Sequence, residues 1–223
     1  MKWRAAVLTG AVLMGNGLWG QGAGENYRPA AVSGATDVAF PPDSAVTGVV
    51  TLGVSVDGSG VVQNVTVIRD VPPLTAAAQE ALKSWKFSPA VKDGKFVPGN
   101  VRVHIVFNPF NPGDTGVGGG SEPGATDGDS GDAEFQPAQL QTAEFAQYPE
   151  NSVASGTVLV QLNVDAEGAV QGARVMRGAG PLAGAVTRTV KSWTFSPATY
   201  KGNAVRSVVP VAFVFASPAQ GTQ

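Results

Sequence analysis

The stretch Lys83-Ser84-Trp85-Lys86-Phe87-Ser88-Pro89-Ala90 decides the fold, and the chain repeats it as Lys191-Ser192-Trp193-Thr194-Phe195-Ser196-Pro197-Ala198. Each copy closes an apolar helical pattern. The serine before the proline is biased towards extended geometry, because the proline ring disfavours the α region for its predecessor. We therefore expect each copy to end a helix, to pack its Trp on the helix face and to continue as an extended segment.

The repeat extends outward from this stretch in both directions. An offset of 108 residues aligns residues 27–107 with residues 135–215 without a gap. Roughly 30 of about 81 aligned pairs are identical, which indicates a duplicated structural unit. A unit of this length is a domain rather than a solenoid repeat. The sequence thus predicts two tandem domains, residues 27–107 and 133–216.

Residues 108–132 separate the two copies and are rich in Gly, Asp, Pro, Ser and Thr. This composition cannot form a core and is typical of a flexible linker, which would let the two domains unfold independently. The spacing of Asp127, Asp129 and Asp132 suggests a calcium loop. An EF-hand loop needs a Glu where Ala138 stands, so the linker interpretation is favoured.

Alternating apolar residues predict the strands of each domain. In the first copy Val50, Leu52, Val54 and Val56 alternate with small or polar residues, and the second copy matches them in phase. Turns beginning at Asp57 and Asp165 follow, each with a late Gly suited to a left-handed position, and each Asp is expected to bond its own backbone. Return strands over residues 61–69 and 169–177 come next.

An apolar stripe at helical spacing then precedes each Trp, and an alternating strand closes each copy over residues 101–107 and 208–215. Pro210 cannot donate to a sheet ladder, so the second of these strands should be a sheet edge. We predict an α+β fold of two small domains, each an antiparallel three-stranded sheet (β-β-α-β) with one helix on one face. The expected core anchors are Leu74, Trp85, Phe87, Pro89, Leu182, Trp193, Phe195 and Pro197.

The N-terminal segment, residues 1–24, has the features of a secretory signal. Lys2 and Arg4 precede an apolar run of about ten residues, the usual length of a signal core and too short to span a bilayer. Small residues follow it and suit cleavage. The alternative is an uncleaved N-terminal anchor, and that would be the route to membrane association. Either way, the body of the protein is expected to be exported.

Composition excludes several classes of function. The formal net charge of −2 and the 14% of charged residues provide no basic field for nucleic acid. The chain has no Cys and a single histidine, His104, which excludes a thiolate zinc site and a histidine metal cluster. No nucleotide-binding glycine motif or nucleophile elbow is present. We therefore expect neither an enzyme nor a cofactor.

Taken together, the proline-ended lead-in, two strands around a Gly turn, the Leu-to-Trp helix, Trp-x-Phe-Ser-Pro-Ala and the Val-rich last strand resemble the C-terminal domain of the TonB energy transducers. The resemblance covers residues 40–107 and 148–215. It implies a periplasmic domain that binds extended peptides of outer-membrane receptors as an added strand beside its last strand. The residues that would form these edges are Val101, Arg102, Val103, His104, Ile105, Val208, Val209, Val211, Ala212 and Phe213.

The resemblance leaves a second hypothesis open. In an envelope scaffold, the same edges would pair with each other or with a second copy in a homodimer, without energy transduction. Members that transduce energy carry a long N-terminal helix with a histidine and a Pro-rich spacer, and neither precedes the first copy here. A long free edge in both domains would favour peptide binding. Edges covered by the lead-in segments or by the sister domain would favour the scaffold.

Overall fold

The computed structural model of the protein describes residues 27–41, 44, 46–108, 134–149, 152, 154–178 and 180–216. The signal segment, the calcium alternative and almost all of the linker expected from the sequence lie outside these residues. Asn108, which we assigned to the linker, is instead the buried last residue of a strand.

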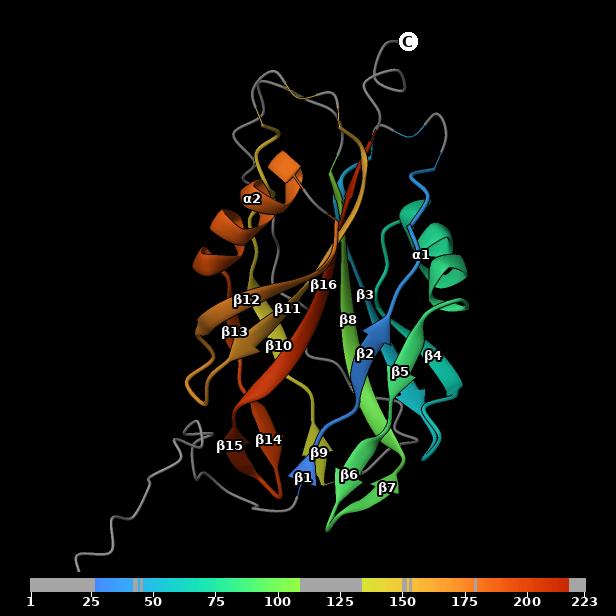
Figure 1. Ribbon diagram of the computed structural model, residues 1–223, viewed down its shortest axis with the longest axis vertical. Helices are drawn as coiled ribbons and strands as arrows, with labels where there is room; N and C mark the ends of the chain where they lie inside the picture. The colour runs from blue at the N-terminus through green and yellow to red at the C-terminus, as the bar shows by residue number, and fades with distance from the viewer. Residues whose placement is uncertain are drawn as a thin grey trace, which may run out of the picture.

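One six-stranded sheet runs through the described chain, with the strand order β12-β11-β16-β8-β3-β4 (Figure 1). Neighbouring strands are antiparallel, except for the central pair of β16 and β8, which is parallel. The strands are β3 (Gly48–Val56), β4 (Val62–Arg69), β8 (Gly99–Asn108), β11 (Gly156–Val164), β12 (Val170–Arg177) and β16 (Ser207–Phe215). The α+β class is confirmed, but the prediction of two separate three-stranded sheets is wrong, because the two copies share this sheet.

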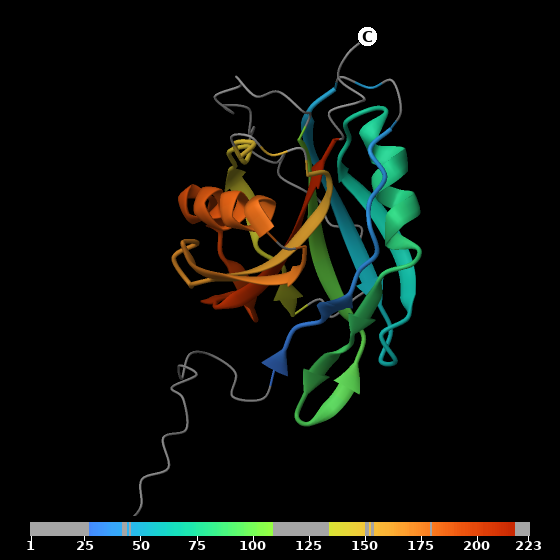
Figure 2. The same cartoon turned by 45° about the horizontal axis from the view of Figure 1, so that its top comes forward.

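One helix from each copy packs on the sheet, and the two helices lie on opposite sides of it (Figure 2). They are α1 (Leu74–Leu82) and α2 (Gly180–Thr189), and α2 continues into the single 3-10 turn η1 (Val190–Ser192). Both helices end before the tryptophan of the repeated stretch. Trp85 and Trp193 therefore lie in the connection after the helix rather than on it, as a correction to the expected helix face, and both are buried.

Short strands surround the main sheet and account for the lead-in segments. In the first copy, β2 (Ala31–Gly34) pairs with β5 (Lys86–Ser88), and β1 (Tyr27–Arg28), β6 (Ala90–Lys92) and β7 (Lys95–Val97) form a small sheet. The second copy repeats this arrangement with β9 (Phe135–Gln136), β10 (Gln139–Thr142), β13 (Thr194–Ser196), β14 (Ala198–Tyr200) and β15 (Asn203–Val205).

The sequence predicts loops at the positions of these small hairpins. Two-residue turns with positive φ at both positions join β6 to β7 at Asp93-Gly94 and β14 to β15 at Lys201-Gly202. Such turns match the right-handed twist of paired strands. The Asp-Gly signal was present in the sequence, but three-residue strands are too short for a period of two to be visible.

Two hydrophobic cores fill the two faces of the sheet, and each takes residues from both copies. The core of the second copy includes Val49 and Val106 from the first copy. The core of the first copy includes Leu159, Ala212 and Val214 from the second. This exchange follows from a parallel central pair with one helix on each face: the side chains that point away from a strand's own helix lie under the other copy's elements. The two halves therefore form one packed unit.

Six of the eight expected core anchors are buried and belong to these two cores. The other two, Pro89 and Pro197 of the repeated stretch, are half-buried and belong to neither core. Trp193 donates from Nε1 to the carbonyl oxygen of Glu144 at 3.1 Å, and its ring lies 5.5 Å from that of Phe213. This hydrogen bond fastens the lead-in of the second copy to its core.

The turns that open the hairpins of the main sheet are organised by their first aspartate, as expected. Asp57 Oδ1 accepts from the N–H groups of Ser59 and Val61, and Oδ2 accepts from Gln63. Asp165 has the corresponding partners in the second copy. The N–H donors at Val61 and Ser59, followed by Gln63, lower the pKa of Asp57, and Ala169 leads the same effect on Asp165.

We expect these two carboxylates to make folding pH-dependent below neutrality. A pKa that is lower in the folded state stabilises the fold above the unfolded value of about 4, and the gain is lost as the pH falls through the folded value. Asp57→Asn combined with Asp165→Asn should therefore lower the free energy of unfolding at pH 7 and flatten its decline with acid. Urea melts from pH 7 to pH 2 measure both effects.

Asp93→Asn is the matched control for this prediction. Asp93 occupies a left-handed turn position that Asn also tolerates. An equal change in the pH profile of the control would contradict the assignment of the effect to the two hairpin turns.

Candidate functional site

The last strands of the two copies, which the sequence predicts to be free edges, lie in the middle of the six-stranded sheet. Residues 104–108 of β8 pair in parallel with residues 211–215 of β16. Each strand also pairs along its length with its own copy's first strand, β3 or β11. Of the ten residues assigned to these edges, five lie within the parallel pairing and are not open to a partner, so the expectation is wrong for them: His104, Ile105, Val211, Ala212 and Phe213. The other five, Val101, Arg102, Val103, Val208 and Val209, lie beyond the parallel pairing, and of these only Val208 is exposed. We call this five-residue pairing the seam.

The seam ends at Pro210, and β8 and β16 diverge on the N-terminal side of that residue. Pro210 faces Gln161 of β11, whereas pairing with β8 begins only at the next residue, Val211. A proline has no N–H to donate, so the ladder stops where the sequence places it. The lead-in segments fill the divergence: Pro29, Phe135 and Pro137 line a hollow together with β8 and β16. In the described residues, only Val208 remains substantially exposed on these strands.

The true outer edges of the main sheet are the return strands β4 and β12. In the described part of the chain each pairs on one side only, β4 with β3 and β12 with β11. At eight residues, each edge is about 26 Å long. Val67 and Val175 occupy equivalent positions on them, and both side chains are 37% exposed. Each edge thus combines unpaired backbone groups with an exposed apolar side chain.

Each of these edges carries two register shifts. On β4 they lie opposite Thr51/Leu52 and Ser55/Val56 of β3, and β12 has the equivalent pair against β11. Such bulges limit uncontrolled edge-to-edge pairing. They leave a regular central run of four residues, 64–67 on β4 and 172–175 on β12. A partner strand would find its uninterrupted ladder there.

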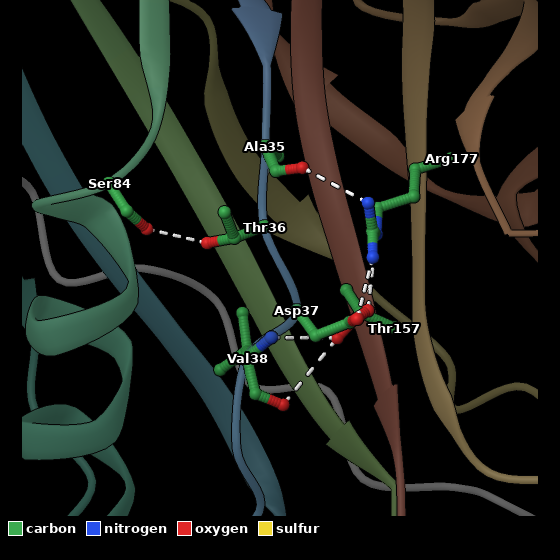
Figure 3. A network of polar contacts seen from close by, with 7 residues as sticks. All are labelled: Ala35, Thr36, Asp37, Val38, Ser84, Thr157 and Arg177. Atoms are coloured by element: carbon green, nitrogen blue, oxygen red, sulfur yellow. Dashed lines mark hydrogen bonds and ion pairs between the residues drawn. The ribbon is translucent and has the colours of Figure 1, made fainter.

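The lead-in of the first copy is fastened to the second copy beside the β12 edge (Figure 3). The N–H of Val38 donates to Oγ1 of Thr157 at 2.9 Å, where both residues are buried. Arg177, the last residue of β12, makes a forked pair with Asp37: Nε to Oδ1 at 3.1 Å and Nη2 to Oδ2 at 2.6 Å. This ion pair is largely exposed, so the buried Thr157 contact is the stronger restraint.

A second junction joins the two copies near β1 and β9. The ring of Tyr27 stacks on that of Tyr200 with a centroid distance of 4.5 Å. Glu134 accepts from Lys92 of the first copy at 2.6 Å and from the hydroxyl of Tyr200 at 3.3 Å. The hydrogen bond from Lys92 is the main cause that lowers the pKa of Glu134. Both ends of the first copy's lead-in are therefore held to the second copy.

His104 is buried in the seam and hydrogen-bonds through Nδ1 with Oγ1 of Thr51 at 3.1 Å. Among the described residues, no three His, Cys, Asp or Glu side chains lie close enough together to hold a metal ion. Nor does any helix in the described ranges have the length and apolar character needed to cross a membrane.

Each copy in this structure has a long hairpin, a helix and a Trp-anchored connection that leads back to a final strand, and a family model matches both copies. The matched family is described as Gram-negative bacterial TonB protein C-terminal, over residues 43–109 and 146–216. The chain belongs to the TonB C-terminal family. No curated protein and no solved structure matches it.

Membership of the TonB C-terminal family confirms the resemblance seen in the sequence, including its two segments. The TonB C-terminal family acts in the Gram-negative envelope in transport, by binding proteins rather than by catalysis. Sequence reasoning missed the two outer edges, because it assigned the binding strand by position in the chain. The uninterrupted apolar runs at residues 105–107 and 211–215 were a usable signal, since strands buried on both faces lose their alternation.

Proposed function

We propose that this protein is a periplasmic TonB-like binding protein that binds extended peptides of outer-membrane receptors by strand addition at β4 and β12. The observation that carries this proposal is the pair of eight-residue strands β4 and β12, each of which pairs on one side only within the described residues. An extended peptide satisfies the backbone groups of such an edge, while its alternate side chains select the partner. Export through the N-terminal segment brings the protein to the compartment of these receptors.

Placing the site on the return strands is consistent with the packing of the molecule. Strand addition at β8 or β16 would require the seam to open, and opening it would expose apolar side chains of both cores. Addition at β4 or β12 leaves the cores intact. The equivalent valines Val67 and Val175 would then contact peptide side chains on the adjacent strand, as cross-strand neighbours do. Two edges on one chain permit two peptides, or two segments of one receptor, to be held at once.

Amide hydrogen exchange on the full chain tests this placement. The probe is a synthetic peptide from the N-terminal periplasmic segment of an outer-membrane receptor. We expect added protection at alternate amides of β4 and β12, because a new strand pairs with every second residue of an edge. The amides of the seam should keep the exchange rates of the free protein. Faster exchange in the seam upon binding would contradict this placement and return the site to the last strands.

Replacing exposed valines by glutamate gives a matched set of variants that tests peptide binding at the two outer edges. Val67→Glu and Val175→Glu should each weaken peptide binding about 2–5-fold, the worth of one cross-strand side-chain pair. Val208→Glu is the control, since Val208 on β16 is exposed to a similar extent, 38%. Fluorescence anisotropy of a labelled peptide measures all three. Weaker binding in Val208→Glu alone would show that the outer edges are not the site.

A further inference from the structure

The two outer edges differ in charge at one position of their regular central runs. The residue there is Thr66 on β4 and Arg174 on β12. The runs 64–67 and 172–175 are the uninterrupted ladders that a partner strand would meet, so each of these two side chains would face a residue of an added strand. The valine that follows is exposed to the same extent on both edges. The duplicated unit therefore keeps its exposed valine and changes the charge beside it.

Arg174 is exposed and makes no hydrogen bond or ion pair with any described residue. Gln161, which lies opposite it on β11, is uncharged, and its Nε2 donates to the carbonyl oxygen of Val32 at 3.0 Å. Gly172 lies two residues earlier on the same face of the strand. A Cβ added there would meet only the side-chain amide of Asn163, at 3.7 Å. The guanidinium thus has donors that no described residue uses, and open space beside it.

The other arginine of β12 already holds an acidic group of this chain (Figure 3). Arg177, at the end of the strand, donates to both carboxylate oxygens of Asp37 and to the carbonyl oxygen of Ala35 at 3.4 Å. An arginine on this edge therefore binds a carboxylate and a backbone carbonyl from one segment of chain, the first copy's lead-in. At Arg174 no described segment of the chain takes that place.

The acidic groups of the second hairpin lie at its turn, away from Arg174. Asp165 and Glu167 precede β12, and Asp165 accepts from N–H groups of its own turn. Arg174 is four residues beyond the start of the strand, about 13 Å along it. β12 contains no acidic residue, and Arg177 at its end has an equivalent, Arg69, at the end of β4. The two edge strands therefore differ in charge by Arg174 alone.

We propose that the β12 edge selects peptides with an acidic side chain, which pairs with Arg174, and that the β4 edge does not. This inference rests on the proposed function, since it specifies which peptide each edge prefers. A guanidinium presents its N–H groups in a fork that matches the two oxygens of a carboxylate. Opposite charges on directly opposed residues of neighbouring strands stabilise the pairing, whereas like charges destabilise it. A peptide with lysine at that place should therefore be disfavoured at β12.

Amide NMR on the full chain measures binding at each edge separately. The probe is the receptor-segment peptide of the exchange experiment, made with amides in place of its carboxylates and with Glu, Gln or Lys at one central position. A peptide that shifts by two residues keeps the same face, so one glutamate can reach Arg174. At residues 172–175 we expect the Glu peptide to bind about 2–5-fold more tightly than the Gln peptide, and the Lys peptide more weakly than either. At residues 64–67 the Glu and Gln peptides should bind equally.

Reciprocal substitutions between the two edges isolate the arginine. Arg174→Thr should remove the preference for Glu at β12, and Thr66→Arg should create it at β4. Arg188→Thr is the matched control, because it removes the same charge from an exposed position on α2 rather than on an edge strand. This control should keep the preference. Salt at about 1 M should reduce the preference of the wild type, because exposed charge pairs are screened.

The outcomes separate this inference from the proposed function. Equal binding of the Glu and Gln peptides at β12 would overturn the acidic selection, while peptide binding at the two edges would stand. An equal loss of the preference in Arg188→Thr would also overturn it, since net charge rather than Arg174 would then be the cause. Binding of none of the peptides at either edge would overturn both the selection and the proposed function.

Discussion

Trp193→Ala is expected to lower the free energy of unfolding by about 3–5 kcal/mol, the usual cost of removing a buried aromatic side chain. Trp193 is 1% exposed, and its truncation also leaves the carbonyl oxygen of Glu144 without its donor. Small domains have only about 5–15 kcal/mol of stability in total. The loss should affect the whole molecule, since Val49 and Val106 of the first copy belong to the same core. Chemical denaturation should therefore show one cooperative transition in both the wild type and the variant.

Trp85→Ala is the matched comparison. Trp85 is also buried, but its Nε1 has no hydrogen-bond partner within the described residues. We expect this variant to lose about 1 kcal/mol less than Trp193→Ala, the worth of one net hydrogen bond. A first transition that removes one copy while the other stays folded would contradict the shared cores. It would restore the independent domains that the linker composition suggested.

Val106→Asp is expected to have the second large effect, because it places a charge in the seam. Val106 is fully buried, faces Phe213 across the parallel pair and belongs to the core of the second copy. An uncompensated charge in such a place costs at least about 3 kcal/mol. Burial would raise the pKa of the introduced carboxyl, so the destabilisation should shrink as the pH falls towards 4. Urea melts at pH 7 and pH 4, with amide exchange of β8 and β16, measure both effects.

Val208→Asp controls for adding a carboxylate to the same pair of strands. Val208 lies on β16 outside the seam and is partly exposed. Its substitution should change stability by about 0.5 kcal/mol or less, as is usual for surface positions. Equal losses in the two variants would mean that the parallel pairing contributes little to the fold.

The sequence predicted the strands of the main sheet and the two helices, because their signals are local, but it did not predict the short strands around them. The alternation at Val50, Leu52 and Val54, the Asp-to-Gly turns and the Trp-x-Phe-Ser-Pro connection each depend on neighbouring residues. The arrangement of the copies was missed, because pairing of β8 with β16 joins segments about 108 residues apart in the chain. Nothing in a local pattern specifies which strand lies beside an apolar one.

The candidate site illustrates the same limit. Pro210 was correctly interpreted as a place where a ladder cannot continue, but it marks the end of the seam rather than a free edge. Val67 and Val175 give no sequence signal, since an exposed valine and a buried one look alike.

The parallel pairing of β8 with β16 also determines how much of the chain must be synthesised before the main sheet can finish folding. β8 is finished at Asn108, but its partner residues, 211–215, are made about 107 residues after the residues with which they pair. Until then a nascent chain presents β8 as an open apolar strand, the kind of edge that pairs with other chains. Export of the chain in an unfolded form would avoid this exposure, because both halves would then reach the same compartment before either one folds.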